Sequence, residues 1–140
     1  MASVGILSMV GLSTLMNLSG MITLLAQGLS RTVGVAFPLF SPMVGMLGAF
    51  ATGSNVNSNV LFAPLQQKIA SFLKINQVVL VSGQTAGGSI GSMISPAKLV
   101  VGCSTSEMKG REGYVLRFTL PVGILIGLLV GVATWMIVHL

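Results

Sequence analysis

The chain has 140 residues, of which 53% are hydrophobic and only 6% are charged. Soluble domains carry about 25% charged residues, so this composition excludes a soluble monomer and indicates a multi-pass protein of the cell membrane. The net charge of +5 reflects seven basic and two acidic residues, and the basic ones are scattered along the chain. Nucleic-acid binding needs a clustered basic face, so we expect the lipid bilayer as a partner and no nucleic acid.

Length is better counted in membrane spans than in soluble domains. A transmembrane helix needs about 20 apolar residues, so 140 residues hold only a few passes. Transporters built of two inverted repeats need more than that. We therefore expect residues 1–140 to be one part of a larger transporter domain. The single cysteine, Cys103, has no His or carboxylate nearby in the sequence, as a thiol nucleophile would need, so no catalytic site and no enzyme are expected.

Residues 1–30 are predicted to form the first transmembrane helix. The segment is apolar apart from small residues, Asn17 and Gln27. Asn17 either hydrogen-bonds a neighbouring helix or lines a polar cavity. Gly28 marks the end of the helix, and Arg31 then reaches the headgroups.

Residues 33–74 are predicted to form a re-entrant helical hairpin. Pro38 and Pro42 interrupt the first arm, and from Pro42 to Phe50 only about 13 Å of helix remain at 1.5 Å per residue. A polar run, residues 51–59, then separates this arm from a second short one that ends near Lys74. Two half-length arms with a polar tip predict a chain that dips into the membrane and leaves on the side it entered.

Residues 75–103 are predicted to form a broken transmembrane helix. A polar stretch from Ser82 to Ser89 includes the adjacent Gly87 and Gly88, and glycine costs about 1 kcal/mol in a helix interior. We expect an unwound link there. The alternative is an intact, glycine-rich helix that packs tightly.

The rest of the chain is predicted as a hydrophilic loop, 104–117, and a last transmembrane helix, 118–140. The loop holds both acidic residues, Glu107 and Glu112, and a solvated connection fits them better than an acid/base pair. Its basic residues favour the cytoplasmic side. The final helix places Trp135 and His139 near its end, where such rings prefer the membrane interface.

The polar tip is the strongest candidate for a binding site. Hydrocarbon offers no hydrogen-bond partners, so hydroxyls and amides in it must be satisfied by protein, water or a ligand. The starts of half-helices also present free backbone amides and a partial positive charge to anions. Self-capping of the helix end is the alternative. We predict neutral donors for a small carboxylate and no metal site, with these substrate contacts: Thr52, Ser54, Asn55, Ser58, Asn59, Gln84, Thr85 and Ser89.

Several strings resemble the C-terminal portion of the lactate permease family, within the ion-transporter superfamily. They are Gly53-Ser54-Asn55 with Ser58-Asn59, Gly83-Gln84-Thr85-Ala86-Gly87-Gly88, Met93-Ile94-Ser95-Pro96 and Arg111-Glu112-Gly113. The resemblance implies paired re-entrant hairpins that bind substrate carboxylates, with lactate or glycolate as substrate and protons as the coupling ion. It also implies an N-terminal repeat that these 140 residues lack. Val56 stands where the group often has Thr, so that one hydroxyl contact is missing.

The sequence thus predicts an all-α membrane protein with a re-entrant hairpin and a discontinuous helix, as in inverted-repeat secondary transporters. The predicted function is symport of a small monocarboxylate with protons, without a bound cofactor. Two alternatives remain. A channel would give flux that neither saturates nor couples to a proton gradient, and a non-transporting membrane subunit would tolerate alanine at both Ser54 and Asn55.

Overall fold

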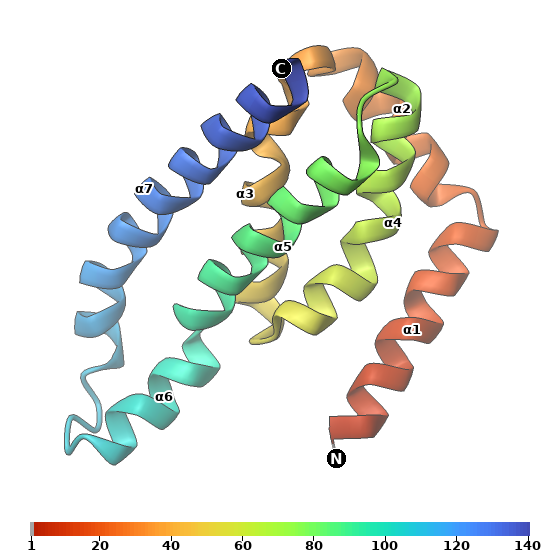
Figure 1. The fold of residues 1–140 in the computed structure, drawn as a ribbon. Helices are drawn as coiled ribbons and strands as arrows, with labels where there is room; N and C mark the ends of the chain where they lie inside the picture. The colour runs from red at the N-terminus through yellow and green to blue at the C-terminus, as the bar shows by residue number, and fades with distance from the viewer. Residues whose placement is uncertain (1) are drawn as a thin grey trace.

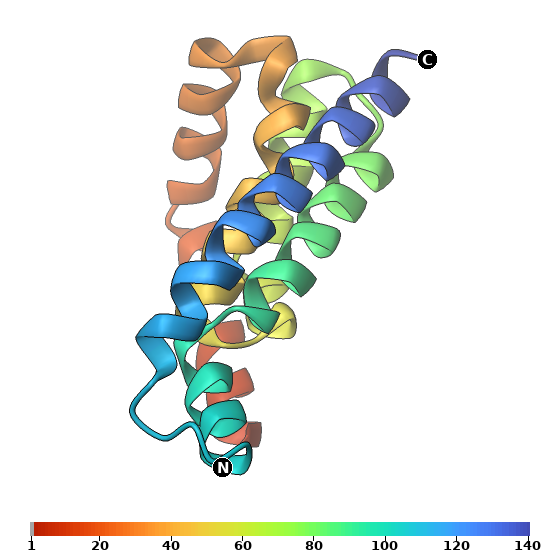
Figure 2. The same ribbon diagram turned by 90° about the vertical axis from the view of Figure 1, so that its left-hand side faces the viewer.

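The computed structural model describes residues 2–140 and is helical throughout (Figure 1), which confirms the all-α class. The elements are α1 (Ala2–Leu18), α2 (Met21–Thr32), the short 3-10 helix η1 (Gly34–Ala36), α3 (Phe37–Thr52), α4 (Asn55–Leu73), α5 (Gln77–Met93), α6 (Pro96–Thr105) and α7 (Glu112–His139). The α2–α3 and α4–α5 turns and the C-terminus gather at one end of the molecule, and the α6–α7 loop lies at the other (Figures 1 and 2).

The N-terminal segment is an elbow rather than the single helix predicted over residues 1–30. Helices α1 and α2 meet at an angle of 71°. Gly20 lies between them with φ 74, in the left-handed region. A residue in that conformation ends a helix and is cheap only for glycine, so the chain changes direction there.

Helices α3 and α4 form a hairpin whose tip is Gly53 and Ser54. The half-length first arm expected from Pro42 is wrong. Pro38 lies in the first turn of α3, where its missing N–H costs nothing, and Pro42 is accommodated inside the helix. With η1, the first arm runs from Gly34 to Thr52, 19 residues that are long and apolar enough to cross a membrane.

Helix α5 is intact where an unwound link was expected. The alternative, a tightly packed glycine-rich helix, is the correct one. A Cβ atom at Gly87 or Gly91 would collide with the backbone carbonyls of Pro42 and Met46, so these glycines let the backbones of α3 and α5 touch. The break lies further on, at Ser95, which adopts ψ 144 immediately before Pro96. Proline disfavours helical geometry in the residue before it, and Pro96 therefore favours a break here, although Pro42, Pro64 and Pro121 are accommodated inside helices.

The last helix is longer than predicted and begins in the expected loop. Helix α7 starts at Glu112, so the connection shrinks to 106–111. Its 28 residues are long and apolar enough to cross a membrane, as is Gly34–Thr52, and the bent α1–α2 pair passes the same test when taken together. Large apolar side chains on α1 and α7 remain exposed, among them Leu7, Leu15 and Leu129. Exposed surface of this kind suits lipid or further protein.

Candidate functional site

The hairpin tip packs directly against the break between α5 and α6. The Ser92 hydroxyl donates a hydrogen bond of 3.2 Å to the carbonyl of Gly53. A Cβ atom on Gly53 would lie 3.4 Å from Cβ of Ala97 and 3.7 Å from the hydroxyl of Ser95. The first turns of α4 and α6 therefore lie close together, and both present the partially positive end of a helix to the same region.

Two hydroxyls at the tip, those of Ser54 and Thr52, find partners within it, whereas the buried Oδ1 of Asn57 has none. The Ser54 hydroxyl caps α4 by accepting a bond of 3.3 Å from the amide of Asn57. The Thr52 hydroxyl donates to the carbonyl of Gly48 at 2.8 Å and accepts a longer bond from the amide of Ser54 at 3.4 Å. Self-capping of the helix start, one of the two predicted roles of these side chains, is thus present in this structure.

A seam of neutral hydrogen bonds joins α4 to α5 beside the tip. The amide of Asn55 donates to the hydroxyl of Ser89 at 2.9 Å. The hydroxyl of Thr85, which is 2.9 Å from the carbonyl of Val81 in its own helix, also lies 3.3 Å from the amide oxygen of Asn59. Asn59 also donates to Asn55 at 3.4 Å. The fold thus brings together polar residues of the tip and of α5, even though α5 is not unwound.

Ser58 and Gln84 lie on the inside of the helix packing rather than at the seam. Both are fully buried. Gln84 donates to the Ser58 hydroxyl at 3.3 Å, and Ser58 donates in turn to the carbonyl of Gly45 at 2.9 Å. Gln66, which is also fully buried, donates to Gln84 at 3.0 Å. These side chains connect α3, α4 and α5 and have no exposed surface for a substrate.

Sequence reasoning missed the role of Gln66. Gln66 lies two residues before Lys68, and a charged residue so close indicates the water interface rather than a buried position. The available signal was a second amide, Gln84, in another apolar segment, since buried amides in membrane proteins need partners on neighbouring helices. Which amides pair is set by the three-dimensional packing.

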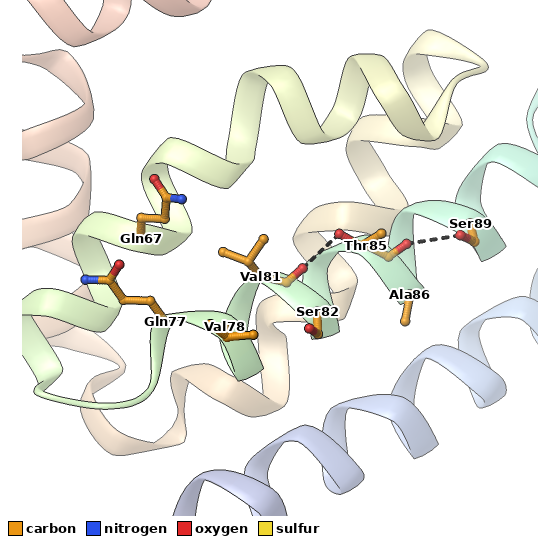
Figure 3. A pocket seen from close by; sticks show the side chains of 8 residues that line it. All are labelled: Gln67, Gln77, Val78, Val81, Ser82, Thr85, Ala86 and Ser89. Atoms are coloured by element: carbon orange, nitrogen blue, oxygen red, sulfur yellow. Dashed lines mark hydrogen bonds between the residues drawn. The ribbon is translucent and has the colours of Figure 1, made fainter.

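An open groove of about 560 Å³ runs along the outer face of α5 (Figure 3). That volume is within the range of small-molecule sites. It is lined by Gln67, Gln77, Val78, Val81, Ser82, Thr85, Ala86 and Ser89. Thr85 and Ser89 therefore belong to both the seam and the groove, so the groove leads along α5 to the tip.

The groove lining also contains residues that the sequence reasoning missed. Val78, Ser82, Thr85 and Ser89 recur every three or four positions, which is the spacing of one helix face. An intact α5 would have revealed this face, but the expected unwound link hid it. Among residues 2–140, no group of three His, Cys, Asp or Glu side chains could hold a metal ion.

Comparison with known proteins identifies the family. The model of the L-lactate permease family matches residues 1–140. The chain belongs to this family. Its permease relatives include a glycolate permease, GlcA, of Escherichia coli K12, which is 42% identical over 118 residues, covering 84% of this chain and 21% of the relative.

Further relatives carry the same family name. The L-lactate permease of Salmonella typhi is 41% identical over 84% of this chain and 21% of its own length. That of Bacillus subtilis strain 168 is 38% identical over 96% of this chain and 24% of its own length. The chain thus spans about a fifth of the length of the first of these relatives. No solved structure matches it.

The strings that carried the resemblance to lactate permeases cluster in space. Gly53-Ser54-Asn55 forms the tip, Met93-Ile94-Ser95-Pro96 forms the break that packs against it, and residues 83–88 lie in α5 beside both. Arg111-Glu112-Gly113 stands apart, at the start of α7. Most of the permease motif residues therefore surround one junction.

Proposed function

We propose that this permease chain forms part of a secondary transporter for a small monocarboxylate such as lactate or glycolate. The observation that carries the proposal is the junction where the starts of α4 and α6 meet beside the seam of neutral donors. The printed names of the relatives, lactate and glycolate permeases, support the substrate class. Proton symport is proposed from the family resemblance alone.

The substrate carboxylate would exchange its water shell for donors at the tip. An uncompensated charge in low dielectric is very costly, and the Asn55 amide together with the hydroxyls of Ser54, Thr85 and Ser89 offers replacement hydrogen bonds. The bond between Asn55 and Ser89 opens to admit the substrate, and it closes again after release. Thr52 and Asn59 complete the contacting set, whereas Ser58 and Gln84 hold the helices in place.

We further propose that α3 and α4 are a re-entrant hairpin with its tip inside the bilayer. In both views the tip ends level with the α5–α6 break and short of the far ends of α1 and α6 (Figures 1 and 2). A polar tip at that depth needs cover from protein or a water-filled path. The groove along α5 provides one wall of such a path.

The remainder of the transporter would form the other walls of the path. The chain spans 21% of the first listed relatives, and inverted-repeat transporters place the substrate between their two repeats. We propose that an N-terminal repeat of the same protein covers the open side of the groove. The binding site would then be complete only in the whole protein.

Lactate uptake into proteoliposomes tests the proposal directly. In the complete transporter, Asn55→Ala and Ser89→Ala should each raise KM for lactate about tenfold, because a hydrogen bond to a charged group is worth about 1.5–3 kcal/mol. Ser104→Ala is the matched control, since Ser104 is exposed on α6 and bonds only its own helix. A wild-type KM in both seam variants would remove the seam from the site.

The same assay separates a transporter from a channel. We expect uptake that saturates with lactate concentration and rises when an inward proton gradient is imposed. Flux that stays linear in lactate and ignores the gradient would favour a channel through the same polar junction. Absence of any lactate or glycolate flux would reject the transport function altogether.

A further inference from the structure

Lys98 places its amine at the junction between the hairpin tip and the α5–α6 break. The residue lies in the first turn of α6, three positions after the break at Ser95. Its Nζ donates a hydrogen bond to the hydroxyl of Ser92, and that hydroxyl donates to the carbonyl of Gly53. The side chain therefore reaches back across the break to the tip, which its place among seven scattered basic residues does not predict.

The partner of this lysine is a neutral hydroxyl. Both acidic residues of the chain, Glu107 and Glu112, lie beyond the end of α6. Glu112 accepts a hydrogen bond from the amide of Gly110 in that same loop. In the part of the chain that the structure describes, the amine of Lys98 is thus matched by Ser92 and not by a carboxylate.

Lys98 is exposed on these 140 residues, so its amine calls for an anion only where the bilayer and the rest of the transporter cover the junction. If the tip lies inside the bilayer, as proposed above, a lysine there costs about 2.5–3.5 kcal/mol on insertion scales. The starts of α4 and α6 add partial positive charge to the same region. Three sources of positive potential therefore converge on the tip, next to the donors of the seam.

We propose that Lys98 is a substrate-binding residue that pairs with the carboxylate of the transported acid. The inference rests on the proposed function and adds one fixed positive charge to a site that the sequence reading built from neutral donors alone. The bond to Ser92 holds the amine ready in the empty site, and the carboxylate then takes over as the partner of the amine. Lysine suits this exchange because its ammonium is a single point charge on a flexible stem.

One cation at the tip also sets the charge of the preferred substrate. A monocarboxylate balances Lys98, whereas a second carboxylate would enter the junction without a partner and pay the cost of its desolvation. The neutral amide of the same acid would forgo the ion pair. We therefore expect lactate and glycolate to compete for the site, and lactamide and malonate to compete poorly.

Charge removal provides the first test, in the complete transporter reconstituted into proteoliposomes. Lys98→Gln should raise KM for lactate about tenfold or more, since a charge-assisted bond is roughly twice as strong as a neutral one. Lys98→Gln should also reduce the preference for lactate over lactamide. Lys98→Arg keeps the positive charge and should restore much of the affinity for lactate and of this preference. Lys109→Gln removes the same charge from the exposed α6–α7 loop and should leave KM and preference unchanged.

Substrate protection provides the second test and does not require transport. Lys98→Cys, in a background without other reactive cysteines, should be labelled by a methanethiosulfonate reagent more slowly when lactate is present. Labelling of Lys109→Cys should not respond to lactate. This readout separates direct contact with the substrate from a purely structural role of Lys98 in holding α6 to the tip.

The outcomes distinguish the two proposals. Lactate transport by the wild type, with Lys98→Gln matching Lys109→Gln and no protection of Lys98→Cys, would overturn the role of Lys98 and leave the proposed function standing. A loss of maximal rate without any change in KM, preference or protection would also overturn it. A wild type that transports no monocarboxylate would instead reject the proposed function.

Discussion

Gly87 and Gly91 illustrate how single residues decide the packing of this segment. An added Cβ atom at either position would collide with backbone atoms of α3. Backbone atoms cannot move aside as the end of a flexible side chain can. The same glycines that reduce the intrinsic helix propensity of α5 therefore allow α3 to pack closely against it. Tertiary packing outweighs the local cost of about 1 kcal/mol per glycine.

Alanine at these positions should destabilise the protein. We expect Gly87→Ala or Gly91→Ala to lower the free energy of unfolding by about 1–3 kcal/mol or more through overpacking, seen as a lower apparent melting temperature in detergent. Gly113→Ala is the control, since nothing lies within 4 Å of its added Cβ atom. Equal melting temperatures for all three variants would contradict the close approach of α3 and α5.

The buried glutamines provide a second prediction for single residues. Gln84→Ala removes the acceptor of Gln66 and leaves a buried amide without that partner, which costs about 1–3 kcal/mol. We expect lower thermal stability with an unchanged KM for lactate, because Gln84 does not face the groove. A raised KM at normal stability would return Gln84 to the substrate site, as the sequence reading had it.

At the level of elements, the start of α4 has two roles, helix capping and the proposed contact with the substrate, and substitutions at Ser54 can separate them. Ser54 caps the helix, and in our proposal it also faces the substrate carboxylate. Aspartate is as good a helix cap as serine, but its charge repels an anion. Ser54→Asp should therefore keep the helix cap and lose lactate uptake.

Alanine at the same position is the counterpart of the aspartate variant. Ser54→Ala removes the cap and should cost about 1 kcal/mol of stability. Because it adds no charge, it should retain more uptake than Ser54→Asp. If Ser54→Asp transports lactate as well as the wild type, the anion does not approach the start of α4.

The sequence revealed those elements whose signals are local. The turn at Gly53 was predictable because a glycine followed by capping residues ends one helix and starts another. The intact α5 was not, because its glycines make sense only once α3 lies against them. The true break has a local signal, Pro96, but the adjacent Gly87 and Gly88 are an equally strong local signal for a break and lie elsewhere.

The same distinction applies to the candidate site. The polar run at the tip and the hydroxyls of α5 were found because polar residues in apolar segments stand out. The sequence could not show that Asn55 is half-buried whereas Ser58 is fully buried, since this depends on which helix face meets α3. The position of Lys98 at the tip could not be predicted either, because its bond to Ser92 crosses the break and exists only in the folded chain.

For the whole molecule, the arrangement of the connections predicts a topology. The α4–α5 turn and the C-terminus lie at the opposite end from the α6–α7 loop (Figure 1). With the basic loop on the cytoplasmic side, Lys74→Cys should react with an impermeant thiol reagent from outside intact cells, and Lys109→Cys only after the cells are opened. The reverse pattern would invert the orientation, and labelling of both from one side would show that α5 and α6 do not cross.

The backbones of α3 and α5 touch at Gly87 and Gly91, and this close contact restricts sliding or rotation of the two helices against each other. In the proposed transporter, a cycle that exposes the tip first to one side of the membrane and then to the other would move α3 and α5 together as one rigid body. The breaks between helices at Gly20, Gly53 and Ser95 are where the backbone could bend during such a cycle.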